Sequence, residues 1–296
     1  MLVGILTAFT LVAFAANSLL CRMALGGSLI DPVSFTTLRV VSGAIILVPL
    51  SRLAAEQPPA LEKQGQEKPG SWASGLALFV YAIAFSLAYV SLDAGMGALI
   101  LFGCVQATMI GAGLKSGERP HPLQWLGLIT AFGGLFYLVS PGIAAPDPLG
   151  AFLMSISGIA WGVYSVRGKE VSAPVHSTAG NFARAAPMTV IASVMAFSLA
   201  RAEAQGVILA LVSGTLTSGL GYVLWYKALR GLTTTRASIV QLLVPVLAAF
   251  GGVVFLAEQV SARLAIASAL ILGGVALAVL FRALPRKISC GRDFSS

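Results

Sequence analysis

The chain is poor in charged residues: Asp, Glu, Lys and Arg together make up 10% of its 296 residues, whereas hydrophobic residues make up 57%. A soluble globular domain carries about 25% charged residues. This chain has too few ions to cover the surface of a soluble fold of its length. The composition therefore excludes an ordinary soluble enzyme, a disordered protein and a secreted disulfide scaffold, and it points to the membrane.

Motifs for metal, nucleotide and hydrolytic chemistry are also missing. The three cysteines, Cys21, Cys104 and Cys290, are an odd number without metal-ligand spacing. No glycine-rich phosphate loop with its Lys-Ser/Thr is present, so an ATP-driven pump is unsupported. The two histidines, His121 and His176, fall at predicted membrane borders, which leaves no interior base to activate a serine. We therefore expect no catalytic residue, no metal and no cofactor.

Long apolar runs dominate what is present. A bilayer-spanning helix needs about 20 mostly apolar residues, and its backbone groups must be satisfied within the segment. The first run starts at Leu2 without a basic leader region, so we expect a retained helix and not a signal peptide. The sequence predicts an all-α polytopic membrane protein with ten transmembrane helices, at 2–21, 32–51, 72–92, 94–114, 122–140, 148–166, 177–200, 205–226, 235–255 and 262–282.

The basic residues predict how the chain is oriented. The formal charge of +8 would suggest nucleic acid in a soluble protein, but Lys and Arg also accumulate in cytoplasmic loops of membrane proteins. With the N-terminus inside, cytoplasmic segments hold 14 of the 19 basic residues, the opposite face holds Arg22, Arg201 and Arg263, and two lie within helices. We expect both termini in the cytoplasm of a bacterial-type inner membrane and no nucleic-acid partner. The cytoplasmic set is Arg52, Lys63, Lys68, Lys115, Arg119, Arg167, Lys169, Lys227, Arg230, Arg236, Arg282, Arg286, Lys287 and Arg292.

Rare residues recur at a nearly constant distance along the chain. Five helices per copy place the second copy in the membrane upside down, as in the inverted repeats of secondary transporters. The alternative is that these matches arose by chance in an apolar sequence. Charged residues within membrane spans are scarce, which argues against chance matches that involve them. The boundaries expected are 1–143 for the first repeat, 144–285 for the second and 286–296 for a cytoplasmic tail. The matched pairs are Arg22 with Arg167, Arg39 with Arg184, Tyr89–Leu92 with Tyr226–Leu229, Gly117-Glu118 with Ala257-Glu258 and Gly133-Gly134 with Gly273-Gly274.

On these motifs the chain resembles the EamA-type drug/metabolite transporter superfamily. The second copy follows the family pattern through Tyr226–Leu229, Ala237-Ser238, Val244–Val246 and Ala257-Glu258, whereas Val105 in the first copy stands where the family usually has the proline matched by Pro245. Within the superfamily the chain looks most like the bacterial exporters of aromatic amino acids. The resemblance implies the ten-helix fold and a small-molecule substrate, which differs widely among members.

Polar and aromatic side chains near mid-span are the candidate substrate-binding residues. Buried polar groups are costly unless paired, and flat apolar walls with a few donors are typical of small-molecule sites. We expect the site near the midplane, lined by the first, third, fourth, sixth, eighth and ninth helices. The candidates are Asn17, Tyr81, Gln106, Trp161, Tyr164, Tyr222, Trp225 and Gln241.

Several candidates have a structural alternative. Tyr222 and Trp225 would also suit an interfacial aromatic belt, and the two glutamines could bridge helices. Arg39 and Arg184, each about seven residues into a helix, are either snorkelling cations or anchors for a substrate carboxylate at two gates. Pro245 should bend its helix and is the preferred hinge.

All 11 acidic residues fall in predicted loops or at helix ends, which argues against a buried carboxylate relay. We expect an exporter of aromatic and neutral amino acids that works by alternating access without ion coupling, as a monomer or homodimer in the lipid bilayer. The alternatives are a proton-coupled exporter of other small metabolites or drugs, and a membrane-embedded enzyme or lipid-handling protein.

Overall fold

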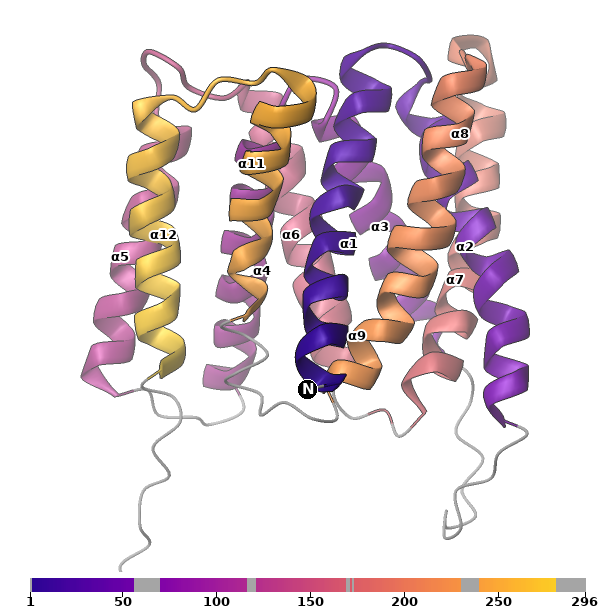
Figure 1. The fold of residues 1–296 in the computed structure, drawn as a ribbon, viewed down its shortest axis with the longest axis horizontal. Helices are drawn as coiled ribbons and strands as arrows, with labels where there is room; N and C mark the ends of the chain where they lie inside the picture. Colours follow the sequence, from indigo (N-terminus) through magenta and orange to yellow (C-terminus); the bar gives the residue numbers. More distant parts are fainter. Residues whose placement is uncertain are drawn as a thin grey trace, which may run out of the picture.

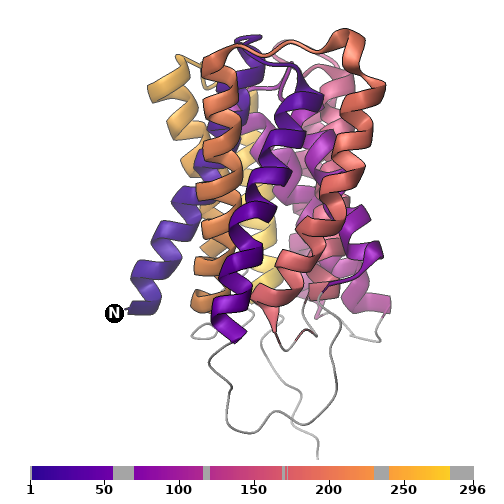
Figure 2. The ribbon, with the colours of Figure 1, turned by 90° about the vertical axis from the view of Figure 1, so that its right-hand side faces the viewer.

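A computed structural model describes residues 2–55, 70–115, 121–168, 171, 173–229 and 240–280. These residues form ten helical spans that run roughly parallel to one axis (Figures 1 and 2). Predicted boundaries agree with the described helix ends within five residues for every span except the start of the ninth, where residues 235–239 lie outside the described part. The all-α prediction is confirmed. The spans are α1 (Leu2–Gly26), α2 (Pro32–Ala55), α3 (Trp72–Ala88), α4 (Ala94–Lys115), α5 (Pro122–Val139), α6 (Pro148–Gly168), α7 (Pro174–Met195), the continuous α8 (Ala204–Val212), η2 (Ser213–Leu220) and α9 (Gly221–Leu229), then α11 (Leu243–Leu256) and α12 (Ala262–Leu280).

Apolar composition explains why these segments are helices in a membrane. In the described part of the chain, six spans are long and apolar enough to cross a bilayer, and three more are shorter apolar helices. The remaining span, α7, is the most polar, because it carries Asn181 and Arg184 and has Pro187 inside it. It packs against α2 and α3, so that its polar side chains face protein.

The packing follows the two halves predicted from the sequence. The helix α1 begins at the lower face in Figure 1 and α6 at the upper face, so the first helices of the two halves run in opposite directions. Equivalent helices pack on each other: α2 on α7, α4 on α11 and α5 on α12. The contact of α3 with α6 is mirrored by that of α8, η2 and α9 with α1. The repeat is therefore visible in the packing, while its boundary residues stay a prediction.

Glycines set the close crossing of α5 and α12. A Cβ placed on Gly127 would lie 2.5 Å from the carbonyl oxygen of Gly274, and one on Gly274 would meet the carbonyl of Gly127 at the same distance. Such small residues let helix backbones approach where lipid offers no hydrophobic driving force. Of the two predicted glycine pairs, Gly134 and Gly274 make such contacts, whereas Gly133 and Gly273 face open space.

A short backbone pairing joins the halves at the upper face. Ile30 and Ala202 form an isolated antiparallel bridge, and the Asp31 N–H donates to the carbonyl of Arg201 at 2.8 Å. The Asp31 carboxylate caps α2 by accepting from the N–H groups of Val33 and Ser34. Burial alone would raise the pKa of Asp31, but these bonds, with that from the Arg201 N–H, lower it. The α1–α2 and α7–α8 connections are thus held together.

Several residues used in the sequence argument lie outside the described part of the chain. They include Glu118, whose match to Glu258 helped to define the repeat, the Ala237-Ser238 step and Cys290. Of the predicted cytoplasmic cations, those outside it are Lys63, Lys68, Arg119, Lys169, Arg230, Arg236, Arg282, Arg286, Lys287 and Arg292.

Candidate functional site

A partly open cavity of about 30 Å³ lies between the two halves of the bundle. Its walls come from α1, α2, α3, α4, α6 and the eighth span, here η2 and α9. The second span was not expected to contribute, and no described residue of the ninth span lines the cavity. The lining residues are Phe14, Asn17, Ser18, Arg39, Tyr81, Phe85, Leu101, Phe102, Trp161, Thr217, Ser218 and Tyr222.

One wall carries polar side chains, and the eighth span is a π-helix where it passes this wall. Widened helical turns of this kind are frequent at functional sites. The η2 hydroxyls of Ser213 and Thr217 donate to Asn17 Oδ1 at 2.7 and 3.1 Å. Gly214 lets this segment touch α2, since a Cβ there would overlap the carbonyl oxygen of Arg39. The amide of Asn17 is therefore held with its oxygen already occupied.

Arg39 brings a positive charge to the cavity. It is 3% exposed; its Nε donates to Ser218 Oγ at 3.1 Å and its Nη2 to the Tyr81 hydroxyl at 2.9 Å. The guanidinium carbon lies 5.3 Å from the Tyr81 ring centroid and 5.1 Å from that of Phe85, within cation–π range. The third nitrogen, Nη1, is buried and has no hydrogen-bond partner. It is the one such side-chain nitrogen or oxygen among the described residues. Leaving a buried charged donor unpaired costs about 1–3 kcal/mol or more.

Aromatic rings form the opposite wall. The Trp161 ring centroid lies 4.8 Å from that of Tyr81 and 5.2 Å from that of Tyr222, so that three helices meet at one indole. Tyr164 stacks on Trp161 from the same helix at 5.4 Å and 22°. These ring contacts hold Trp161 in place and leave flat apolar surface facing the cavity.

The structure gathers four of the eight predicted binding residues at the cavity: Asn17, Tyr81, Trp161 and Tyr222. Tyr164 supports Trp161 from behind without lining the cavity. The other three lie elsewhere. Gln106 lines a separate, smaller cavity among α4, α5 and α12, Trp225 packs against Phe14 in another cluster, and Gln241 is half-buried just before α11.

The predicted gating residues are also separated. Arg39 is buried against other helices and does not reach a helix end, whereas its repeat counterpart Arg184 donates to the carbonyl of Gly180 on its own helix at 2.9 Å. Arg184 also lies over the Trp72 ring at 5.9 Å. Pro245 is buried in the first turn of α11, directly after the helix is interrupted at Leu242. A proline there removes an N–H that would otherwise bond the preceding turn.

Sequence reasoning missed four apolar residues of the lining: Phe14, Phe85, Leu101 and Phe102. Phenylalanine in a helix that is apolar on all sides carries no signal that separates cavity from lipid. The recurrence of aromatic residues on α3 at four-residue spacing, Tyr81 and Phe85, was the one available hint.

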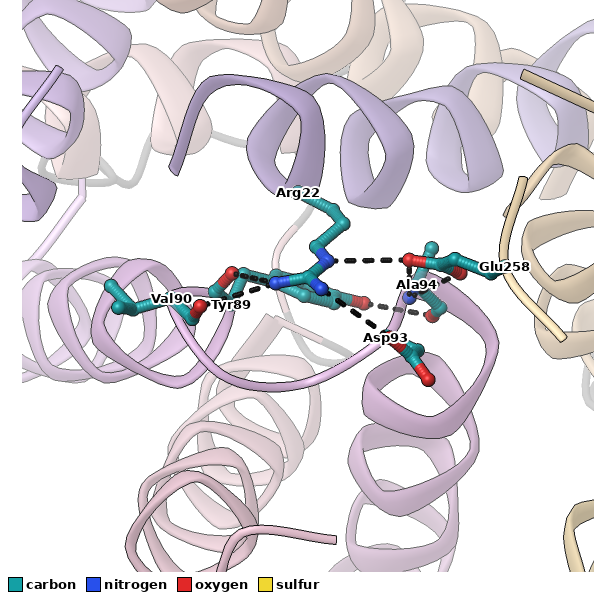
Figure 3. Close-up of polar contacts among 6 residues, drawn as sticks. All are labelled: Arg22, Tyr89, Val90, Asp93, Ala94 and Glu258. Atoms are coloured by element: carbon teal, nitrogen blue, oxygen red, sulfur yellow. Dashed lines mark hydrogen bonds and ion pairs between the residues drawn. The ribbon is translucent and has the colours of Figure 1, made fainter. Parts of the chain in front are cut away.

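A second polar cluster lies at the upper face of the bundle, where it links the end of α1 to the α3–α4 and α11–α12 connections (Figure 3). Arg22, near the end of α1, donates from Nε to Glu258 Oε1 at 3.2 Å and from Nη2 to Asp93 Oδ1 at 3.4 Å. Its Nη1 donates to the carbonyl oxygens of Tyr89 and Val90. Glu258 in turn accepts from the Ala94 N–H with both oxygens, at 3.1 and 3.0 Å, and so caps α4. We call Arg22, Asp93 and Glu258 the outer cluster.

The outer cluster joins the halves of the chain, because Arg22 and Asp93 belong to the first and Glu258 to the second. The side chains of Arg22 and Glu258 are 22% and 11% exposed. Burial raises the pKa of Glu258, with the nearby Asp93 adding to the rise, while the Ala94 N–H and Arg22 oppose it. Burying ionised Glu258 therefore costs desolvation free energy, which its bonds to the Ala94 N–H and to Arg22 offset in part.

Ten membrane spans around a central cavity, with a cluster that ties one end, define a multi-pass membrane carrier. The model of the EamA-like transporter family matches residues 2–140 and 148–280, and the chain belongs to this family. The two matched segments coincide with the two five-helix halves.

Relatives and a solved structure agree with the family. An uncharacterized Pseudomonas aeruginosa protein, PA1977, is 48% identical over 273 residues, 92% of this chain and 93% of that protein. The uncharacterized Bacillus subtilis transporter YoaV is 23% identical over 257 residues, 83% of this chain and 86% of its own. The uncharacterized Escherichia coli inner membrane transporter YedA is 25% identical over 171 residues, 56% of this chain and 54% of its own. A crystal structure 21% identical in sequence superposes with a TM-score of 0.64 over 96% of this chain and 99% of that one, which supports the fold.

Proposed function

We propose that this membrane transporter exports amino acids, aromatic and neutral ones among them, by alternating access. The observation that carries the proposal is the aromatic wall around Trp161 at a cavity between the two halves. An aromatic substrate stacked there would gain about 0.5–1.5 kcal/mol per ring pair beyond the burial of its surface. The polar wall around Asn17 and Ser218 would orient its backbone groups.

The charge distribution favours transport without ion coupling. In the described part of the chain, no carboxylate lines the cavity, and the acidic residues lie in connections or beside helix ends. Proton- and sodium-coupled carriers commonly use a buried carboxylate as relay or ligand. We therefore propose that the substrate moves down its own gradient.

The outer cluster suggests which side is closed. Because it ties the end of α1 to the α3–α4 and α11–α12 connections, access to the cavity from that face requires its bonds to break. We propose that this is the non-cytoplasmic face of an inner membrane, with both termini in the cytoplasm and the chain acting as a monomer or homodimer. The printed name of YedA and the predicted excess of cytoplasmic cations support this placement.

The break before Pro245 is a candidate hinge for the movement. With Leu242 outside regular helix and Pro245 unable to donate to the preceding turn, α11 can pivot at small cost. Pro245→Ala should slow transport while expression stays at the wild-type level. Unchanged flux would remove Pro245 from the mechanism.

One observation favours a second candidate, proton-coupled export of other small metabolites or drugs. Glu258 is a largely buried carboxylate with a raised pKa, and it bridges the two halves of the carrier. A proton exchanged there would couple to opening of the outer face. The two candidates differ in whether flux requires a proton gradient.

Reconstitution tests the proposal. Purified protein in proteoliposomes should equilibrate labelled phenylalanine or tryptophan without any imposed ion gradient. Trp161→Ala should weaken transport of aromatic amino acids more than that of alanine, since it removes the central ring of the wall. No flux of any amino acid would refute the substrate class, and flux that requires a proton gradient would replace the facilitated mechanism by the second candidate.

A further inference from the structure

Arg39 is hydrogen-bonded through two of its three nitrogens and unpaired at the third. Ser218 and Tyr81 fix its Nε and Nη2 from two other helices, while Nη1 is buried without a hydrogen-bond partner. The side chain lines the central cavity and lies deep in the bundle, at 3% exposure. A rigid guanidinium with an unpaired N–H at the wall of a cavity is suited to bind an oxygen anion.

The charge of Arg39 has no counter-ion in the cavity wall. Among the described residues that line it, Arg39 is the charged one, and the rings of Tyr81 and Phe85 beside the guanidinium are neutral. A buried cation without an ionic partner is costly, so a ligand that brings a negative charge is favoured. The cavity is therefore matched to an anion.

The polar wall is poorly suited to an ammonium group. Asn17 Oδ1 already accepts from Ser213 and Thr217, and the oxygens of Ser218 and Tyr81 are bonded to Arg39, whose positive charge repels an ammonium group. With no carboxylate in the lining, a substrate ammonium finds no ionic partner, and the rings of Tyr81 and Phe85 that could attract it already face the Arg39 guanidinium. The two charged ends of an amino acid are thus recognised unequally.

We propose that Arg39 binds the carboxylate of the transported molecule and that the ammonium group is dispensable. This inference rests on the proposed transport function and names the group that the cavity selects. Aromatic carboxylates without an amino group, such as 3-phenylpropionate, are then carried through the same cavity, and the corresponding amines are not.

Competition in counterflow tests this with the wild-type protein. Proteoliposomes loaded with unlabelled phenylalanine take up labelled phenylalanine, and 3-phenylpropionate or phenethylamine is added outside; uptake of labelled 3-phenylpropionate is measured in parallel. We expect 3-phenylpropionate to inhibit within about tenfold of the concentration at which phenylalanine does, and phenethylamine to leave uptake unchanged at a hundredfold excess. Equal inhibition by the amine, or none by the acid, would overturn the proposal.

Variants test whether Arg39 is the residue that binds the substrate carboxylate. Arg39→Gln should weaken binding of labelled phenylalanine at least tenfold in a scintillation-proximity assay, and Arg39→Lys should recover part of the loss because it restores the charge. Arg184→Gln is the matched control: its arginine is the repeat counterpart, bonds its own helix and does not line the cavity, so binding should stay at the wild-type level. Equal loss in both glutamine variants would contradict a specific role of Arg39.

The outcomes separate this inference from the transport function on which it rests. Uptake of labelled 3-phenylpropionate without uptake of phenylalanine would refute amino-acid export and leave the role of Arg39 standing. Uptake of phenylalanine that phenethylamine inhibits as well as 3-phenylpropionate does would leave the transport function standing and refute the role of Arg39. If Arg39→Gln is not monodisperse after purification, the wild-type competition series still decides.

Discussion

Replacing Arg22 by alanine removes the cation at the centre of the outer cluster. Arg22 donates to Glu258, Asp93 and the carbonyls of Tyr89 and Val90, over distances of 3.1–3.4 Å. Hydrogen bonds to charged groups contribute about 1.5–3 kcal/mol when buried, and exposed ion pairs about 0.2–1 kcal/mol. Because Arg22 is 22% exposed, we expect the substitution to cost the closed outer face about 1.4–2.8 kcal/mol.

A loss of that size shifts the ratio of open to closed molecules by about 10- to 100-fold. The shift can be read from Ser18→Cys, a cavity position on the same helix, in a background where Cys21, Cys104 and Cys290 are alanine. A membrane-impermeant maleimide applied to the outer face should label this cysteine at least tenfold faster in Arg22→Ala than in the parent.

Arg263→Ala is the control. Arg263 lies at the same face but donates to the carbonyls of Leu138 and Ser140 and makes no contact with the outer cluster. Its removal should leave the labelling rate unchanged. If Arg22→Ala labels no faster than the parent while the control behaves as expected, the outer cluster does not close this face.

Three further predictions concern the close approach at Gly214, the carboxylate of Glu258 and the helix cap at Asp31. Gly214→Ala should lower the thermal midpoint in detergent by the equivalent of about 1–3 kcal/mol, because its Cβ overlaps the Arg39 carbonyl oxygen, while Gly273→Ala, which faces open space, should not. Glu258→Gln should abolish a pH dependence of outer labelling. Burial raises the pKa of Glu258 in this structure, and we expect opening to return the carboxylate to water and its pKa to the ordinary value, so the closed form is favoured below pH 4.5. Wild-type labelling should then rise as pH passes upward through the raised pKa, and a pH-independent wild type would contradict this. Asp31→Ala should lose about 1 kcal/mol of stability at neutral pH, as for a lost helix cap. Because the pKa of Asp31 is lowered in the folded protein, the stability difference between wild type and variant should shrink as pH falls below 3.8. A difference that stays constant with pH would exclude the carboxylate as its source.

Much of the fold could be predicted because its causes are local. Apolar runs of bilayer length require helices, and the matched arginines and glycines reveal the repeat. The packing of α5 on α12 through Gly134 and Gly274 follows from that pattern, although which glycine of each pair makes the contact depends on helix rotation. The sequence of a helix that is apolar on all sides does not reveal how the helix is rotated about its own axis.

The same limit explains the mixed outcome at the site. Trp161 and Tyr222 were found because large polar-tipped rings are unusual at mid-span, and they line the cavity. Gln106 is equally unusual, yet its face of α4 turns toward α5 and α12. The free N–H of Arg39 could not be predicted, since it depends on where Ser218 and Tyr81 arrive from other helices.

The central claim, that the carried molecule occupies the cavity between the two halves, can be tested by locating a bound heavy-atom substrate. The protein would be crystallised with 4-bromophenylalanine and the bromine found from its anomalous signal. We predict a single peak beside Trp161 and Tyr222, with the substrate carboxylate at Arg39 Nη1. A peak at the Gln106 cavity or on the lipid-facing surface, with the central cavity empty, would contradict the account.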